Sequence, residues 1–346
     1  MTDHPNMVVV GGFLGAGKTT LILAAARELA QRGLKSAIIL NDQGDSLVDT
    51  QLARQHGFDA GEVTGGCFCC QFSTLMESAQ SLRSHSPDVI FAEPVGSCTD
   101  VSATVLRPLR EFYAGEFRLT PFTVCVDPSQ GREMERLDAN PHLGFLFRNQ
   151  LAEADLVCYT KSDRYPVTRA PLATSPAARF VSAQTGQGVP AWLDEVLFGE
   201  LLPGAHTLDI DYEEYARAEA ALAWLNLSAI IECDPALSPA MLLGPLLDRI
   251  AGSLEIVHLK ATDQSDSGFL KAALCSGQTE PQIEGALDGA PATMHRLLIN
   301  LRATGDPHPV RAVVEESLAE LNGHILSHQI ACFTPAPPKR PVWDRP

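Results

Sequence analysis

The stretch from Gly12 to Thr19 reads GFLGAGKT and follows a short apolar run, MVVV, at residues 7–10. It fits the pattern G-x-x-x-x-G-K-[ST], in the place where that pattern has a mechanism, after a strand and at the start of a helix. Glycines let the backbone curl so that successive N–H groups and the helix N-terminus face a phosphate. The stretch predicts a nucleotide-binding loop rather than a plain glycine-rich turn. Its expected contacts to the nucleotide are Gly12, Gly15, Ala16, Gly17, Lys18, Thr19 and Thr20.

Three side chains are candidates for the chemistry at this loop. Lys18 would reach the β and γ phosphates, and the Thr19 hydroxyl would coordinate magnesium. Glu93 ends the apolar run DVIFAE, where a carboxylate at the C-terminal edge of a strand can touch the metal or its bound water. We therefore expect Lys18 and Glu93 to be catalytic. Asp42, at the end of another strand-like run, is a further magnesium candidate, directly or through water.

Outward from the loop, the first 200 residues alternate strand-like and helix-like runs. Strands are expected at residues 7–10, 36–40, 89–92, 122–126, 156–160 and 179–181, and a helix over 19–33 that Gly33 stops. This order predicts an α/β fold, a mainly parallel sheet with helices on both faces. The expected domains are a nucleotide-binding domain over 1–203, an acidic linker over 204–220, a small α+β domain over 221–332 and a proline-rich tail over 333–346.

The second domain has a pattern of its own. Strand-like and helix-like runs follow in the approximate order strand, helix, three strands, helix, with the helices expected in residues 238–254 and 308–323. Such a domain is compatible with binding a protein, a ligand or a second copy of the chain in a homodimer.

The base of the nucleotide should be read near residues 160–163, TKSD. They fit the guanine pattern [NT]-K-x-D, in which Asp163 accepts hydrogen bonds from guanine, the Lys161 stem lies along the ring, and Thr160 opens the motif. Adenine lacks that pair of donors, so Asp163 would be left unpaired against it. Ser182 and Ala183, after the next strand, would add a backbone contact to the guanine oxygen. These residues predict GTP rather than ATP.

Residues 65–70 read GGCFCC and place Cys67, Cys69 and Cys70 together, whereas the other six of the nine cysteines are scattered. Three soft thiolates suit zinc, cobalt or copper(I) and do not suit magnesium. Because three ligands leave a position open, an exchangeable zinc or cobalt site is favoured over a structural one, with Asp42, water or a partner's side chain as the fourth ligand. A disulfide or redox role, or an inert loop, is the alternative.

Composition limits the partners. The chain has 346 residues, 45% of them hydrophobic, and a formal net charge of −16, which would repel nucleic acid and anionic membranes. An export signal and an apolar run of about 18 residues are both missing from the sequence. We expect a cytoplasmic protein without nucleic-acid or membrane partners.

Taken in their order, these motifs make the sequence resemble the CobW-like family of P-loop GTPases, which act in metal trafficking and in cofactor assembly. The matching residues are GGFLGAGKTTL, ILNDQG, GGCFCC, FAEPVG and TKSD, and the resemblance covers roughly residues 7 to 200. It implies a slowly hydrolysing GTP-dependent metallochaperone. Such a protein would hold zinc or cobalt on the three clustered cysteines and deliver it to a client metalloprotein or a cofactor-assembly enzyme.

Two other functions use the same residues. One is a GTPase scaffold in which GTP and a structural zinc stabilise a protein-binding surface. The other is a small-molecule kinase or ligase that uses the phosphate loop, against which TKSD and the cysteine cluster both count.

Overall fold

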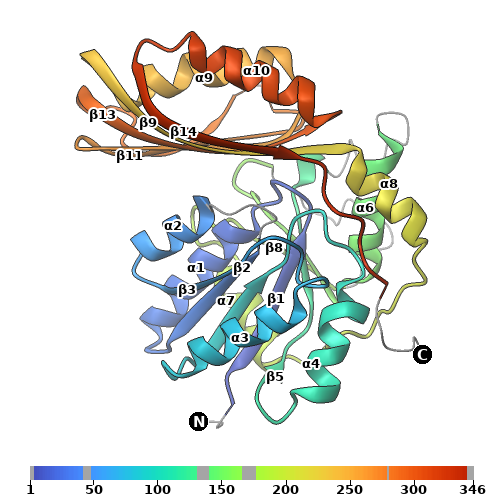
Figure 1. Cartoon of the computed structure of the whole chain (residues 1–346). Helices are drawn as coiled ribbons and strands as arrows, with labels where there is room; N and C mark the ends of the chain where they lie inside the picture. The colour runs from blue at the N-terminus through green and yellow to red at the C-terminus, as the bar shows by residue number, and fades with distance from the viewer. Residues whose placement is uncertain (1–3, 42–47, 131–139, 166–176, 279, 341–346) are drawn as a thin grey trace. The chain divides into compact units, whose positions relative to one another are not determined.

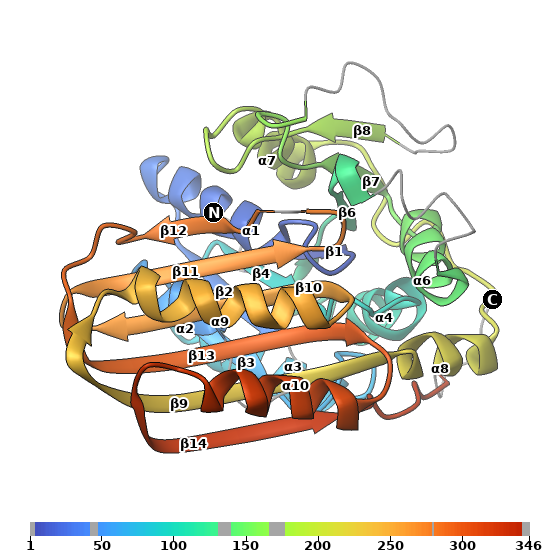
Figure 2. The ribbon, with the colours of Figure 1, turned by 90° about the horizontal axis from the view of Figure 1, so that it is seen from above.

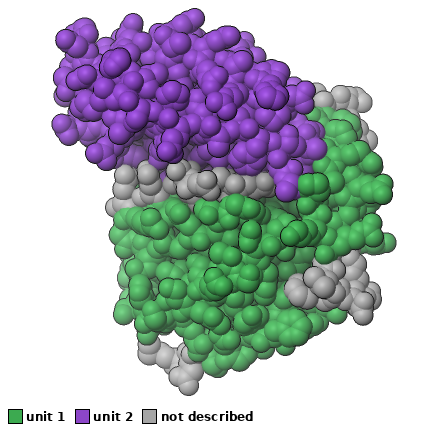
Figure 3. All heavy atoms as spheres, in the orientation of Figure 1, with its two compact units in different colours: residues 1–43, 49–218, 337–346 green, residues 44–48, 219–336 purple. Residues whose placement is uncertain are grey.

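The structure, a computed structural model, describes residues 4–41, 48–130, 140–165, 177–278 and 280–340. The chain forms two compact units (Figure 3). The first comprises residues 1–43, 49–218 and 337–346, and the second comprises 44–48 and 219–336. Among the described residues, no helix has both the length and the apolar character to cross a membrane.

The first unit contains a parallel sheet in the order β3, β2, β4, β1, β6, β7, β8, with β5 also paired to β1. Its strands are β1 (Asn6–Gly12), β2 (Ser36–Asn41), β3 (Asp59–Val63), β4 (Val89–Glu93), β5 (Arg118–Leu119), β6 (Thr123–Val126), β7 (Leu156–Tyr159) and β8 (Ala177–Phe180). The central strands are buried on both faces, as their β-branched runs predict. All six expected strands are present; β3 and β5 are additional.

Helices cover both faces of this sheet (Figure 1). The helices that lie wholly or mostly in this unit are α1 (Lys18–Gln31), α2 (Val48–Gln55), α3 (Phe72–Arg83), α4 (Arg107–Phe112), α6 (Pro141–Ala152), α7 (Val189–Phe198) and α8 (Tyr212–Ala220), with a π-helix over Ser102–Leu106. The expected stop at Gly33 is confirmed, since its φ is 77° and its N–H donates to the Ala30 carbonyl at 3.0 Å.

The second unit is an antiparallel sheet in the order β12, β11, β10, β13, β9, β14. Its elements are β9 (Leu222–Leu237), α9 (Pro239–Ser253), β10 (Ile256–Ser265), β11 (Gly268–Cys275), β12 (Gln282–Gly285), β13 (Ala292–Thr304), α10 (Pro307–Ala319) and β14 (His324–Phe333). Helices α9 and α10 lie over the sheet, as Figure 2 shows, and enclose its apolar core.

The fold class expected from the sequence is confirmed, a mainly parallel sheet with helices and a smaller α+β unit. The C-terminal strand count was too low, because β12 and β14 are absent from the expected order. Both are edge strands of that sheet, and β14 is largely exposed, so neither carries the apolar alternation by which a half-buried strand is recognised.

Candidate nucleotide and metal sites

The phosphate loop joins β1 to α1 through three glycines with positive φ. Gly12, Gly15 and Gly17 have φ values of 130°, 77° and 86°, which L side chains rarely adopt. At Gly12 a Cβ atom would also collide with the Cys125 carbonyl oxygen on the neighbouring strand β6. The loop therefore needs glycine at Gly12 for its conformation and for the close approach of two strands.

Lys18, Thr19 and Glu93 meet at the start of α1. The Lys18 ammonium donates to the carbonyls of Gly12 at 2.9 Å and Phe13 at 3.2 Å, and its Nζ lies 3.9 Å from Glu93 Oε1. The Thr19 hydroxyl donates to the same Oε1 at 3.1 Å. All three side chains are buried, whereas Thr20 is exposed. A buried hydroxyl beside a carboxylate is a pair of hard oxygen donors, which fits magnesium.

Gly96, three residues after Glu93, lies against the phosphate loop. A Cβ atom there would come within 2.8 Å of Leu14 Cδ2 and 3.0 Å of Lys18 Nζ. Gln150 of α6 fixes this segment from behind, donating to the carbonyls of Gly96 at 3.0 Å and Cys98 at 2.8 Å. The segment after β4 is therefore held between the phosphate loop and α6.

The predicted guanine segment is also tied to the phosphate loop. The Thr160 hydroxyl donates to the Ala16 carbonyl at 2.7 Å, so this residue positions the loop rather than presenting its side chain to a base. Lys161 has a φ of 55° and donates to the Gly15 carbonyl at 3.2 Å and to Asp127 at 2.7 Å. Asp127 was not predicted from the sequence. Its one sequence signal is that it directly follows the buried strand β6, in the run VCVD.

The remaining predicted base contacts follow β7 and β8. The Ser162 N–H donates to the Val181 carbonyl at 3.1 Å, which joins the TKSD segment to the residues after β8. Ser182 is buried and accepts from the Thr185 N–H at 3.1 Å, Ala183 is half-buried, and Asp163 is exposed. Four loops that are distant in sequence thus meet at the carboxyl edge of the parallel sheet, which is where such sheets bind ligands.

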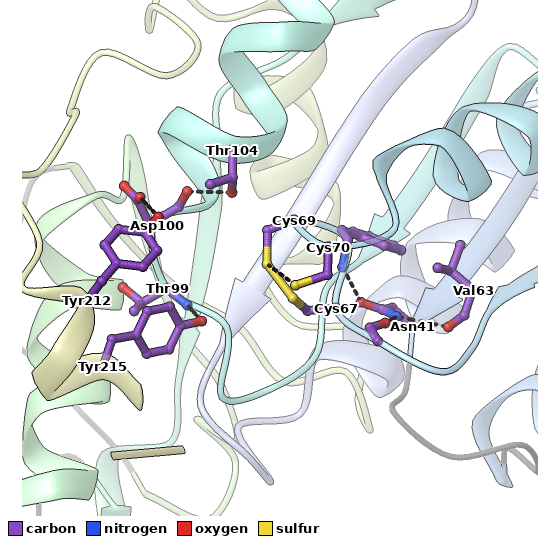
Figure 4. Close-up of a disulfide and its surroundings, with 12 residues drawn as sticks. Asn41, Val63, Cys67, Cys69, Cys70, Thr99, Asp100, Thr104, Tyr212 and Tyr215 are labelled. Carbon is purple, nitrogen blue, oxygen red and sulfur yellow. Dashed lines mark hydrogen bonds between the residues drawn. A yellow bond between two sulfur atoms is a disulfide. The ribbon is translucent and has the colours of Figure 1, made fainter. Parts of the chain in front are cut away.

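The three clustered cysteines follow β3 in a tight turn, which Figure 4 shows. Cys67 and Cys69 form a disulfide, a state that the sequence left as an alternative, and Cys70 Sγ lies 3.9 Å from Cys69 Sγ. The three sulfur atoms all lie within 4.8 Å of one another. Once reduced, such a set fits a tetrahedral thiolate metal, whose sulfurs are about 3.8 Å apart when each metal–sulfur bond is about 2.3 Å.

Asn41 holds this turn and was not predicted. Its Oδ1 accepts from the Phe68 N–H at 2.8 Å, and its Nδ2 donates to the carbonyls of Val63 at 2.8 Å and Gly66 at 2.7 Å (Figure 4). Asn41 ends β2 directly after Leu40, which pairs with Glu93 of β4. The residue that anchors the cysteine turn and the carboxylate beside Thr19 therefore lie on adjacent strands. Asp42, one of the candidates for the fourth ligand and for magnesium, lies outside the described residues.

A further buried polar cluster supports the segment after Gly96. Asp100 has a φ of 65° and accepts from the Tyr212 hydroxyl at 2.5 Å, and the Tyr215 hydroxyl accepts from the Thr99 N–H at 3.1 Å (Figure 4). Glu153 accepts from the Ser102 N–H at 2.9 Å. Burial, with a smaller contribution from the Asp100 charge, raises the pKa of Glu153 to about 8.

Comparison with known proteins agrees with the motifs. The model of the CobW/HypB/UreG nucleotide-binding domain matches residues 6–178. The chain belongs to this family. The family match includes the phosphate loop, the three clustered cysteines, Glu93 and the TKSD segment.

Individual relatives each match just under half of the chain. The zinc chaperone YeiR of Escherichia coli is 32% identical over 166 residues, 45% of this chain and 46% of YeiR. The zinc chaperone CobW of Pseudomonas aeruginosa is 27% identical over 190 residues, 46% of this chain and 49% of that protein. The chain thus spans just under half the length of these curated relatives. The nickel complex of HypB from Helicobacter pylori is similar over 60% of this chain and 93% of its own, with 16% identity and a TM-score of 0.42.

Proposed function

We propose that this protein is a GTP-dependent metallochaperone that carries zinc or cobalt on Cys67, Cys69 and Cys70. The observation that carries the proposal is the adjacency of the two sites. Asn41 holds the cysteine turn, its neighbour Leu40 pairs with Glu93, and Glu93 accepts from Thr19 of the phosphate loop. A change of nucleotide that displaces Glu93 would move the end of β4, which is paired with β2, the strand that carries Asn41.

The nucleotide end of this arrangement uses the residues in distinct roles. The N–H groups of the phosphate loop and the Lys18 ammonium bind and orient the phosphates. Thr19 and Glu93 would hold magnesium, which would supply charge neutralisation on the phosphates. Among the residues that the structure describes, no side chain beyond Glu93 is placed here as a base, so we expect slow intrinsic hydrolysis of GTP that accelerates with a client or a metal.

The base end favours guanine. Lys161 is fixed across the loop by Gly15 and Asp127, which leaves its aliphatic stem to lie along a ring. Asp163, two residues after Lys161, is exposed and offers a carboxylate for the two guanine donors.

The relatives' description as zinc chaperones supports the same metal for this chain.

The metal end favours exchange. Three thiolates occupy three of the four coordination positions of zinc. A client's side chain can then bind at the fourth position before the three thiolates dissociate. Cys69 and Cys70 are half-buried, so a partner has access to their sulfur atoms. We propose that the recipient is a metalloprotein or a cofactor-assembly enzyme in the cytoplasm.

The deciding experiment is a zinc titration against a competing chelator under reducing conditions with magnesium. It is run with GDP and then with a non-hydrolysable GTP analogue. The proposal expects an affinity that differs between the two nucleotides and that falls at least tenfold in a Cys67→Ser, Cys69→Ser, Cys70→Ser triple variant. Cys332→Ser, a half-buried cysteine of the second unit, is the matched control and should bind as the wild type does.

The outcomes separate the competing functions. A cysteine-dependent affinity that ignores the nucleotide would mean a GTPase scaffold with a structural zinc, because coupling between two sites must appear as a difference in affinity. Failure to bind zinc or cobalt through these cysteines would refute the metallochaperone. Phosphorylation of an added small molecule, without GDP and free phosphate in its absence, would indicate the kinase or ligase instead.

A further inference from the structure

The same cysteine turn is built to form a disulfide as well as to bind a metal. Cys67 and Cys69 are joined, and their Cα atoms are 5.3 Å apart, within the range that disulfides require. Cys69 and Cys70 are consecutive, and consecutive Cα atoms across a trans peptide are about 3.8 Å apart, which is too close for that range. The spacing excludes the Cys69–Cys70 pair, and the structure joins Cys67 to Cys69 with Cys70 as the third, free thiol.

The backbone of the turn is held by residues outside the sulfur chemistry. Phe68, between the paired cysteines, is fully buried, and its N–H donates to Asn41. The N–H groups of Cys70 and Gln71 both donate to the Cys67 carbonyl at 2.9 Å. These contacts involve no sulfur atom, so both oxidation states can share one backbone conformation.

The turn also holds the thiols that an oxidant reaches first. Cys69 and Cys70 are half-buried, whereas five of the scattered cysteines are buried, namely Cys98, Cys125, Cys158, Cys233 and Cys275. Burial raises the pKa of the Cys158, Cys233 and Cys332 thiols, which keeps them protonated and unreactive at neutral pH. Oxidation should therefore concentrate on the clustered cysteines.

We propose that Cys67 and Cys69 form a reversible disulfide that excludes the metal, so that the thiol state of this turn controls when the protein can carry its cargo. The exclusion rests on the function proposed above. A sulfur in a disulfide has no thiolate lone pair to give to zinc, and Cys70 alone cannot hold the ion. Oxidation then empties the site, and reduction restores it.

The chemistry balances with a small-molecule disulfide such as oxidised glutathione. The more exposed Cys69 thiolate attacks one sulfur of that disulfide, forms a mixed disulfide and expels one glutathione thiolate. The Cys67 thiolate then attacks Cys69 Sγ, forms the internal disulfide and expels the second glutathione thiolate. The protein loses two electrons and two thiol protons, and one glutathione disulfide becomes two thiols.

The test uses the full chain, both apo and zinc-loaded, equilibrated across a series of reduced-to-oxidised glutathione ratios. Thiols are trapped by alkylation and located by mass spectrometry, and a chromophoric chelator reports released zinc. We expect the loss of both the Cys67 and Cys69 thiols in the same molecules while Cys70 stays alkylated. One zinc should be released for each disulfide formed, with full recovery on reduction.

Variants separate the roles of the three sulfurs. Cys70→Ser should form the disulfide at the same glutathione ratio as the wild type, because Cys70 is not part of the pair. Cys67→Ser should stop at a mixed disulfide of Cys69 with glutathione. Cys332→Ser should follow the wild type in both thiol trapping and zinc release.

The result can overturn the proposal in separate ways. Apo protein in which Cys67 and Cys69 stay alkylated while Cys332 or intermolecular links oxidise would refute the disulfide itself. Zinc that stays bound while the disulfide forms would refute the exclusion. A disulfide that forms normally in a chain that binds neither zinc nor cobalt would refute the control of a metal cargo. In that case the metallochaperone fails while the thiol pair stands.

Discussion

At the scale of single residues, the cysteine turn depends on one amide. Asn41 uses one acceptor and two donors on three backbone groups, and its own side chain is almost fully buried. A buried carbonyl that loses its donor costs the protein roughly 1–3 kcal/mol. The geometry of the three sulfurs therefore rests on a side chain that takes no part in their chemistry.

Replacing this amide by a carboxylate tests that dependence. Asn41→Asp keeps the acceptor for Phe68 but turns two donors into an acceptor that faces two carbonyl oxygens. We expect a loss of about 2 kcal/mol or more in the free energy of unfolding at pH 8. The loss should shrink at pH 4, where the new carboxyl group is protonated and can donate again. Urea unfolding at both pH values measures it.

Asn149→Asp is the matched control for that variant. Within the described residues Asn149 donates a single hydrogen bond, to the Phe145 carbonyl, from a half-buried position on α6. Its cost should be below about 1 kcal/mol. Equal losses in the two variants would contradict the special role of Asn41.

Glu153 gives a second prediction at this scale. Its pKa is about 8 in the folded protein against 4.5 for the free side chain, so between these values the folded state holds a proton that the unfolded state has lost. The group's contribution to stability is then greatest below pH 4.5 and falls as the pH rises to about 8, by at most about 1.4 kcal/mol per pH unit. Above pH 8 this contribution is constant.

Glu153→Gln removes that titration while keeping the shape of the side chain. The variant's free energy of unfolding relative to the wild type should rise steadily from pH 5 to pH 8 and then level off. Chemical denaturation at several pH values checks this. Parallel pH profiles for the two proteins would show that Glu153 is ionised in the folded state.

The residues predicted from the sequence were those with chemistry of their own, and Asn41, Asp127, Gln150 and Glu153 were missed. The reason is physical. Asn41 reaches the cysteine turn only because β2 pairs with β3, with Asn41 opposite Val63, and that pairing is between strands that no local motif links. Lys18, Thr19 and Glu93 could be placed together because a strand–loop–helix motif fixes the first two and strand ends share one edge of the sheet.

At the scale of elements, the approach of β1 to β6 constrains the phosphate loop. Gly12 combines a φ of 130° with a Cβ position blocked by the Cys125 carbonyl oxygen. Gly33, at the end of α1, has a φ of 77° but nothing within 4 Å of its Cβ position. Substituting alanine at Gly33 therefore measures the free-energy cost of the backbone conformation alone, and the same change at Gly12 adds the cost of the steric collision.

Gly12→Ala should destabilise the protein by more than Gly33→Ala does. The Gly33 change costs about 1 kcal/mol for its backbone conformation. The Gly12 change adds the displacement of β6 or of the loop, and we expect it to weaken binding of GDP at least tenfold. Thermal unfolding and a fluorescent-GDP titration give the two readouts. Equal losses of stability with intact GDP binding would contradict the constraint.

Elements were predictable where their environment is uniform. The central strands could be predicted from apolar runs because both of their faces are buried. Helix α1 could be predicted from helical periodicity because one side of it packs on the core. The edge strands β3, β12 and β14 could not, since their side chains meet solvent and neighbours in no regular alternation.

At the scale of the whole molecule, two compact units each enclose a core of their own. The alternation of strand and helix predicted the first, and a change of pattern near Pro203 and Gly204 predicted that a second would follow. Composition alone could not show how far the first unit extends. Its acidic segment DYEEYARA, residues 211–218, carries two tyrosines that are buried in the unit.

Those tyrosines decide where the chain can be shortened. A fragment ending at residue 203 would retain every strand of the parallel sheet. It would lose two hydrogen bonds, the one from the Thr99 N–H to the Tyr215 hydroxyl and the one from the Tyr212 hydroxyl to Asp100. A fragment ending at Ala218 keeps both. We expect the longer fragment to melt several degrees higher and to resist proteolysis between residues 94 and 106, as limited digestion and calorimetry would show. Identical melting would mean that the segment behind the phosphate loop holds its shape without this helix. A higher melting temperature of the longer fragment would show instead that the segment after β4 is supported by a helix that follows the last parallel strand in the sequence.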